Sequence, residues 1–231
     1  MKTRTSLILC ALAVLVLVAV QPAPCSAGFI GDTDGNTITA TAKSWYTGGG
    51  GSGPEKMVDG SAMSDTPVLK TSLNTNTDWA GSWLTHVSND PEYNTGWVLF
   101  TFNKNTSLNE IVIWNLASSE HTNAYGRGMG AVTISYSTGA DTTGTTGGSL
   151  FNGTLNEATW VTGGVGYQND ITFTGISNVK AVKMTYTSTY HSIAPGDAVG
   201  LSEVRFAPEP ATLALLGLGG LGLLLRRKRS K

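Results

Sequence analysis

Few residues of this 231-residue chain are placed to do catalytic chemistry. Its three histidines, His86, His121 and His191, are scattered, and none has a second histidine at a spacing that suits a metal ion. No serine stands in the Gly-x-Ser-x-Gly pattern of a nucleophile elbow. Two carboxylates far apart in a sequence can still cooperate in glycoside hydrolysis, which leaves a small glycan hydrolase as the third interpretation. We expect no catalytic residues.

Aromatic residues in turn-rich segments suit a different task, the binding of sugars. Their faces stack on the apolar side of a pyranose, and a few polar groups fix its hydroxyls. Arg127 has a second interpretation, as a structural strut in its loop. The residues expected to contact a ligand at one end of the fold are Trp45, Trp79, Trp83, Arg127, Tyr190 and His191. The aromatic residues expected in the core are Trp97, Trp114 and Tyr136.

The charge balance argues against nucleic acid as the partner. Only 13% of the residues are charged, against about 25% in a typical soluble domain. Residues 28–207 contain 8 Lys+Arg and 15 Asp+Glu, a net charge of −7, so the basic charge is concentrated at the two ends of the chain. A folded, exported domain fits this composition better than a disordered chain, which would need high net charge and few apolar residues.

The first 27 residues have the pattern of a secretory signal peptide. Lys2 and Arg4 precede an apolar run over 7–20, and the small residues Cys25, Ser26 and Ala27 follow. Both cysteines of the chain, Cys10 and Cys25, fall in this segment. The mature domain is therefore expected to have no disulfide and no cysteine-bound zinc.

The last 24 residues, 208–231, have a three-part order. Pro208-Glu209-Pro210 precedes an uncharged stretch over 211–225, and a basic cluster over 226–231 follows. The positive-inside rule leaves the basic cluster in the cytoplasm and the preceding domain outside it. This order resembles the PEP-CTERM sorting signal of Gram-negative bacteria, which implies an exosortase as a partner and a membrane helix before processing. A plain tail anchor is the alternative.

Residues 28–207 are predicted to form a single all-β domain, an antiparallel β-sandwich. Two-residue alternation of apolar and polar residues recurs, and no 3.6-residue period lasts long enough for a helix. Glycine- and threonine-rich segments such as 48–53 and 137–148 are expected to be surface turns. The alternating segments are 132–137, 171–174, 182–186 and 204–206, and the more continuously apolar ones, expected to be covered on both faces, are 97–102 and 111–114.

The order of several motifs resembles a family. Asp59-Gly60-Ser61, the segments 97–102 and 108–115, Gly126-Arg127-Gly128 before 132–139, and the closing segment 200–206 resemble a discoidin-like (coagulation-factor C-domain, galactose-binding-like) jelly roll. The resemblance implies a carbohydrate-binding β-sandwich. Thr66 stands where that family usually has a tryptophan, and the segment 64–93 is longer than expected, which affects the binding loops more than the fold.

The resemblance also implies a structural calcium ion. An early Asp-Gly loop and a glutamate in the last strand hold it in the family, and the corresponding positions here are Asp59, the Ser61 carbonyl, Ser64 and Glu203. Calcium prefers several oxygen ligands of this kind. In the alternative, Asp59 caps a turn and Glu203 pairs with a base. A second acidic loop over 32–36 is expected to be a turn.

Together these features predict an exported, envelope- or surface-associated protein without catalytic activity. It is expected to bind carbohydrate or exopolysaccharide through loops of the sandwich. A purely structural surface or matrix protein without a specific ligand is the main alternative.

Overall fold

The structure, a computed structural model, describes residues 29–31, 35–45, 53–65, 68, 70–75, 81–85, 95–116, 127–158, 164–190 and 199–208. The expected signal peptide and the apolar stretch 211–225 lie outside these residues. Within these ranges no helix is long and apolar enough to cross a membrane. The elements are β1 (Ile38–Ala42), the 3-10 helix η1 (Pro54–Met57), β2 (Trp83–Leu84), β3 (Gly96–Asn115), β4 (Ala131–Thr138), β5 (Gly148–Thr154), β6 (Asn169–Tyr186) and β7 (Gly200–Ala207).

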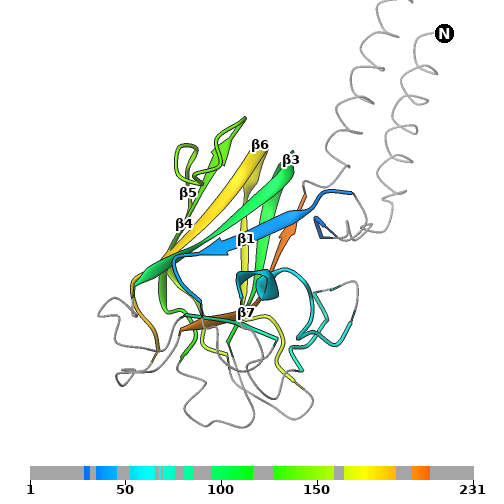
Figure 1. Cartoon of the computed structure of the whole chain (residues 1–231), viewed down its shortest axis with the longest axis vertical. Coiled ribbons are helices and arrows are strands. Elements are labelled where there is room, and N and C mark those ends of the chain that lie inside the picture. Colours follow the sequence, from blue (N-terminus) through cyan, green and yellow to red (C-terminus); the bar gives the residue numbers. More distant parts are fainter. Residues whose placement is uncertain are drawn as a thin grey trace, which may run out of the picture.

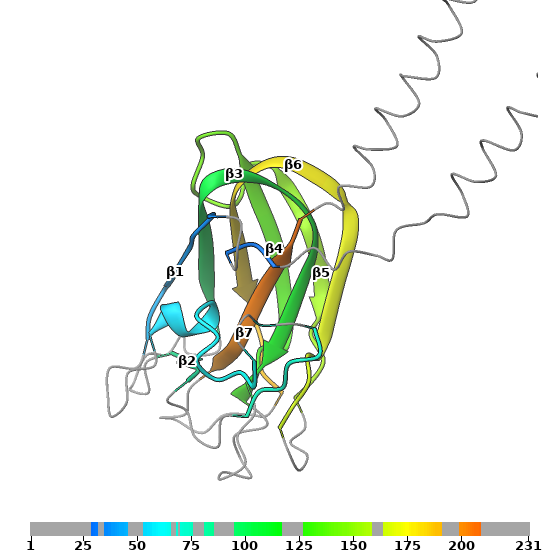
Figure 2. The same ribbon diagram turned by 90° about the vertical axis from the view of Figure 1, so that its right-hand side faces the viewer.

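The strands form one antiparallel sheet that folds over on itself into two layers. The order is β2-β7-β3-β6-β4-β5, and β1 also pairs with β3. In the first layer, the start of β3 lies between β1 and the end of β6, with β4 and β5 beyond. In the second layer, the end of β3 lies between β7 and the start of β6. The predicted all-β antiparallel sandwich is confirmed (Figures 1 and 2).

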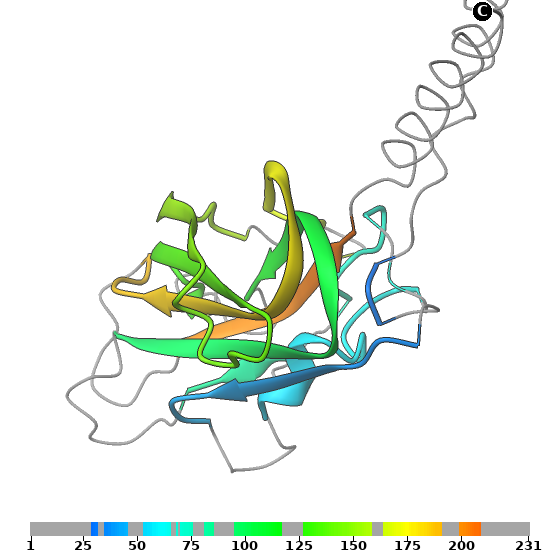
Figure 3. The same cartoon turned by 90° about the horizontal axis from the view of Figure 1, so that it is seen from above.

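The two long strands turn between the layers at one end of the sandwich, which we call the bend end (Figure 3). The β3–β6 register shifts three times between Thr101 and Glu110, as expected where a strand bends strongly. Asn178 adopts a left-handed backbone with a φ of 63°, a conformation that asparagine tolerates better than most residues. Its side chain accepts a hydrogen bond of 2.6 Å from Asn105 Nδ2. The bend is thus fastened across the two strands.

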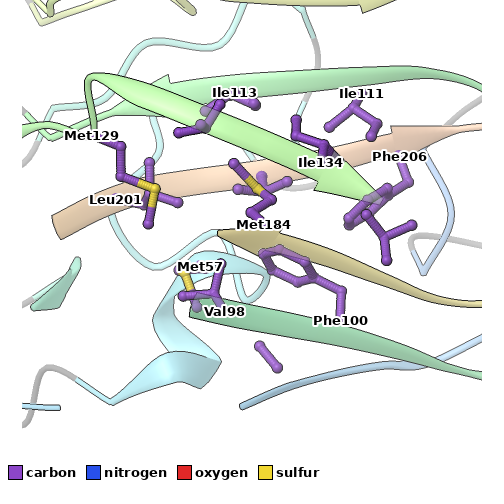
Figure 4. Packing of buried hydrophobic residues seen from close by; sticks show 14 of the residues in the cluster. Met57, Val98, Phe100, Ile111, Ile113, Met129, Ile134, Met184, Leu201 and Phe206 are labelled. Atoms are coloured by element: carbon purple, nitrogen blue, oxygen red, sulfur yellow. The ribbon is translucent and has the colours of Figure 1, made fainter. Parts of the chain in front are cut away.

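The main core fills the space between the layers. Figure 4 shows side chains from η1, β3, β6 and β7, among them Met57, Phe100, Met184 and Phe206, directed into one interior. The Phe206 ring meets Phe100 and Phe102 edge to face, each at a centroid distance of 5.2 Å. This geometry suits the ring quadrupoles and adds to the burial of apolar area. Phe206 of the second layer thus packs directly against Phe100 and Phe102 of the first layer.

A smaller cluster covers the outer face of the second layer. Val112 and Trp114, which alternate with core residues, pack there with Phe29, Met63, Val68 and Ala207. The indole N–H of Trp114 donates to the Ser72 carbonyl at 3.2 Å. The segment 111–114 is covered on both faces as predicted. β7 is also buried along its whole length, so Arg205, expected on an exposed face, is 5% exposed.

The first layer has one buried face and one outer face. Over residues 96–102 buried and half-buried positions alternate, and the expectation that this segment is covered on both faces is wrong. Trp97 lies half-buried on the outer face instead of in the core. The reason is strand geometry, since its neighbour Val98 takes the inward position and successive side chains point to opposite faces. Tyr136 is partly buried against the core, and Trp114 is fully buried as expected.

Truncation of Phe206 should remove the contact that joins the two layers. We expect Phe206→Ala to lower the free energy of unfolding by about 3–5 kcal/mol, as for other buried aromatic residues. Phe151→Ala is the matched control, because this ring is only partly buried on β5, and its loss should be clearly smaller. Urea unfolding followed by tryptophan fluorescence measures both. Equal losses would show that the aromatic cluster does not dominate the core.

Candidate functional site

The candidate site lies at the end of the sandwich opposite the bend, which we call the loop end. β1 and β6 finish here, and β4 and β7 begin here (Figure 1). Opposite it, at the bend end, Ile30 N donates to the Phe206 carbonyl at 2.8 Å. The first and last described segments of the domain therefore meet far from the loop end.

Trp83 is a buried strut at the loop end. Its side chain is 0% exposed, and its ring meets Tyr186 edge to face at 6.4 Å. Its indole N–H donates to the Ser44 carbonyl at 3.2 Å, the kind of partner that a buried indole needs. Trp83 has no exposed face on which a sugar could stack, which corrects its prediction as a ligand-binding residue.

Trp45 is the predicted aromatic residue that the structure places at the surface. It follows Ser44, which Trp83 holds, and its side chain is 46% exposed. An exposed indole next to a fixed backbone carbonyl is positioned at low cost in side-chain entropy, because tryptophan has only two rotatable side-chain bonds. Trp45 can therefore present a flat apolar face to a ligand. Trp79 and His191, predicted for the same role, lie outside the described residues.

Backbone bridges attach the segment of Arg127 to β7 and to the segment of Tyr190. Gly128 pairs with Gly200, and Met129 pairs with Thr189. Arg127 and Tyr190 are both half-buried. Burial raises the pKa of the Tyr190 hydroxyl, and the negative charge of Glu157 raises it further. The hydroxyl therefore stays protonated and is able to donate a hydrogen bond at neutral pH. The structure thus places two of the predicted polar residues on neighbouring backbone segments.

Asn115 organises the loop end and was not predicted. Its buried Nδ2 donates to the carbonyls of Met129 (2.9 Å) and Asn156 (3.1 Å). Its Oδ1 accepts from the backbone N–H groups of Met129 (2.9 Å) and Leu116 (3.2 Å). One amide therefore ties together three loop segments, and each of its bonds satisfies a backbone group that would be costly to leave unpaired. The available signal was a polar residue directly after the apolar segment 111–114.

A buried hydroxyl on β7 extends this network. Ser202 Oγ accepts from Asn74 Nδ2 at 2.7 Å and contacts Ser82 Oγ at 3.3 Å. It donates to the Asn115 carbonyl at 3.3 Å. The segments before β2 and around 74 are thereby attached to β7 and β3. One buried polar network thus joins the end of β3 and the start of β7 to the segments around 74, 82, 129 and 156.

The predicted calcium positions meet in the segment that follows η1 and on β7, apart from the aromatic residues. Glu203 accepts from Gly60 N at 3.2 Å and lies 2.7 Å from Arg205 Nε. Asp59 accepts from Ser61 N at 2.8 Å and pairs with Lys56 at 3.1 Å. Burial acts to raise the pKa of Asp59, but the hydrogen bonds from Ser61 and Lys56 outweigh it and the pKa is lowered.

This donor set fits a calcium ion in part. The Asp-Gly loop and the Glu203 carboxylate do lie together, as the family resemblance implies. In this arrangement, however, Lys56 pairs with Asp59, Arg205 lies against Glu203, and the Ser64 hydroxyl donates to Asp65 at 2.7 Å. Among the described residues no group of three or more His, Cys, Asp or Glu side chains could hold a metal ion. The carboxyl groups of Asp59 and Glu203 are suitable ligands for a cation, but the neighbouring positive charges of Lys56 and Arg205 repel it.

Another carboxylate pair lies on the outer face of the second layer. Lys70 donates to Glu110 and, at 2.9 Å, to Asp170. Burial and the hydrogen-bonded Asp170 raise the pKa of Glu110, although Lys70 acts in the opposite direction. Two carboxyl groups in hydrogen-bond contact are closer than the ~5 Å needed to place a glycosidic bond between them. This pair serves as an ion cluster on the surface.

The C-terminal segment matches a known sorting signal. Residues 207–229 match the family model of the PEP-CTERM protein-sorting motif. The interpretation of Pro208-Glu209-Pro210 and the residues after it as this signal is confirmed. The motif indicates export and sorting to the cell envelope or surface. No curated protein is significantly similar to this chain.

Several solved structures are similar to the chain. An F5/8 type C domain from Bacteroides fragilis is 13% identical, with 74% of this chain and 91% of that chain covered and a TM-score of 0.47. A GH29 fucosidase from Ruminococcus gnavus in complex with fucose is 14% identical, with 78% and 26% covered and a TM-score of 0.46. The CBM32-1 and CBM32-2 domains of Clostridium perfringens ZmpB in complex with GalNAc are 18% identical, with 75% and 34% covered and a TM-score of 0.46. This chain thus spans about a quarter and a third of the last two. One of these structures, the F5/8 type C domain, represents the coagulation-factor C-domain family that the sequence resembles.

The buried Glu203 should make stability fall as pH rises. Burial raises its pKa from 4.5 to about 8, although the Arg205 charge acts in the opposite direction. Between these values the folded chain keeps a proton that the unfolded chain has released, so the free energy of unfolding decreases through this window. Urea unfolding between pH 5 and 8.5 measures it. Glu203→Gln should lack this decrease, and the exposed control Glu157→Gln should keep it. An unchanged slope in Glu203→Gln would contradict the assignment.

Proposed function

We propose that this chain is a non-catalytic carbohydrate- or exopolysaccharide-binding protein of the cell surface, which an exosortase processes after export. The observation that carries the proposal is the exposed Trp45 indole at the loop end, next to the Ser44 carbonyl that the buried Trp83 binds. A flat aromatic face with hydrogen-bonding groups nearby is the usual composition of a sugar site. The hydroxyl of Tyr190 and the guanidinium of Arg127 supply polar groups at the same end.

The direction of the chain supports this use of the loop end. β7 runs from the loop end at Gly200 to the bend end at Ala207, and the sorting signal begins at once. A domain held through its C-terminus at the envelope would therefore turn the bend end toward the membrane. The loop end would face outward, where extracellular polysaccharide is found.

The loop-end site can be tested with the full chain purified in detergent. Affinity electrophoresis in gels that contain different soluble polysaccharides should show retardation by at least one of them. Trp45→Ala should weaken this binding about ten-fold, because stacked aromatic residues are typical hot spots worth more than 1 kcal/mol. The matched control is Tyr167→Ala, an exposed aromatic residue at 38% that packs on Trp114 at the second layer. It should bind as the wild type does.

The rival interpretations give different results in the same experiment. A purely structural matrix protein would show no retardation in any gel. A small hydrolase would release reducing sugar from a retarding polysaccharide, and a single carboxylate substitution would abolish the release. Equal binding by Trp45→Ala and Tyr167→Ala would overturn the loop-end site.

We also propose a structural calcium ion at Asp59, the Ser61 carbonyl, Ser64 and Glu203. What supports it is the contact between the Asp-Gly loop and the buried Glu203. Calcium would replace Lys56 as the partner of Asp59. Calcium should then raise the melting temperature by several degrees, a chelator should reverse the rise, and magnesium should not substitute, because it demands a smaller octahedral site. Asp59→Asn should abolish the effect. A melting temperature that ignores calcium and chelator would remove the ion.

A further inference from the structure

The outer face of the first layer carries a row of side chains that lies outside the loop-end site. Register places Trp97 of β3 opposite Thr185 of β6, Thr185 opposite Thr133 of β4, and Thr133 opposite Asn152 of β5. Lys43 N donates to the Trp97 carbonyl at 3.0 Å, which continues the β1–β3 register by one residue. We call these five residues the cross-strand row. Because cross-strand partners share a face, their side chains all stand on the outer side.

The cross-strand row is accessible and polar. Lys43, Thr133 and Asn152 are exposed, and Trp97 and Thr185 are half-buried. Strands lie about 4.8 Å apart, so the four steps from β1 to β5 span roughly 19 Å. The row offers an aromatic ring, two hydroxyls and an amide at regular spacing. Such a straight line of donors and acceptors matches an extended polymer better than a single small sugar.

The loop over residues 139–147, between β4 and β5, forms a wall along one side of the row. Ser135 Oγ donates to the Gly144 carbonyl at 2.7 Å, and Gly144 N donates to Ser137 Oγ at 3.1 Å. A β-carbon on Gly144 would come within 2.8 Å of the Lys183 Cβ and 2.9 Å of the Leu99 side chain. The loop therefore lies tightly on the neighbouring positions and ends before the row.

The wall covers the base of Lys183, and the end of this side chain reaches the row. Its Nζ lies over the Trp97 ring, 5.1 Å from the centroid, a favourable position for a cation on indole. Lys43 is the neighbour of Trp97 in the row and brings a second lysine to it. Residues 28–207 have only 8 Lys+Arg against 15 Asp+Glu, so two lysines at one tryptophan are a local concentration of positive charge.

We propose that the cross-strand row, together with Lys183, binds an acidic polysaccharide whose sugars carry carboxylate groups. The Trp97 ring contacts the apolar face of one sugar, and the two ammonium groups pair with its carboxylate or a neighbouring one. Thr185, Thr133 and Asn152 bond the hydroxyls of the sugars that follow. The inference rests on the proposed function for carbohydrate binding, and it names the charge of the polymer and a second surface that binds it.

Nucleic acid is the other extended polyanion to consider. A nucleic-acid site neutralises many phosphates with many bases, and the row has two lysines on a domain of net negative charge. A line of hydroxyl and amide groups suits a polymer that is itself rich in hydroxyls. Polysaccharide is therefore the better match.

The test uses the full chain in detergent and affinity electrophoresis in alginate, whose every sugar carries a carboxylate. Alginate whose carboxyl groups have been reduced to alcohols is the matched neutral polymer, and single-stranded DNA is the third probe. The wild type should bind alginate at least ten-fold more tightly than the reduced polymer. This preference should shrink as salt rises, because exposed charges are screened.

Lysine variants locate the binding. Lys183→Gln and Lys43→Gln should each weaken alginate binding about three-fold, as for one exposed ion pair, and the double variant about ten-fold. Lys180→Gln is the matched control, because it removes the same charge from the same strand at the bend end, where its Nζ donates to the Asn103 carbonyl. It should stay within two-fold of the wild type. Melting temperatures of all variants should be equal, since these side chains lie outside the core.

Equal losses in Lys183→Gln and Lys180→Gln would overturn the proposal, as would equal binding of both alginate forms or tighter binding of DNA. A chain that binds neutral glycans through Trp45 but not alginate would overturn this inference and leave the proposed function standing. Alginate binding that survives Trp45→Ala and is lost in the double lysine variant would support the row and move carbohydrate binding from Trp45 to the outer face of the first layer.

Discussion

The constraint on which the rest of the structure depends is that both layers are built from the same two strands. β3 and β6 each run through the first layer, turn at the bend end and continue through the second. Their apolar residues must therefore face one shared interior before and after the turn, and the contact of Phe206 with Phe100 and Phe102 closes this interior across the layers. At the other end β1 and β6 finish and β4 and β7 begin, and the candidate site lies there.

The loop end is organised by buried polar groups more than by apolar packing. The Asn115 amide and the Ser202 hydroxyl together reach the segments around 74, 82, 116, 129 and 156. A chain with no cysteine after residue 25 cannot fasten its loops with disulfides, and a saturated hydrogen-bond network achieves a similar fixation. Trp83 also joins the Trp45 segment to the core.

Much of the fold was predictable from the sequence because strand alternation is local. The segments 132–137, 182–186 and 204–206 are strands with the predicted inward residues, and the sorting motif is a contiguous pattern. The segments 97–102 and 111–114 belong to one bent strand because both pair with β6, about 70 residues away. No local sequence pattern predicts that the two segments are continuous. The two misplaced tryptophans have the same origin. Trp83 sits among turn residues but is buried by distant strands, and Trp97 sits in an apolar run but points outward. Whether an aromatic residue is a ligand contact or a core residue is decided by these long-range neighbours.

The path of β7 has a mechanical meaning for a domain held at its C-terminal end. A ligand that pulls on the loop end loads the chain along β7, parallel to the strand and perpendicular to its hydrogen bonds with β3. Such a load shears the whole ladder at once and does not open it one pair after another. A domain held in this way would resist a pulling force through β7, the same strand that leads into the sorting motif.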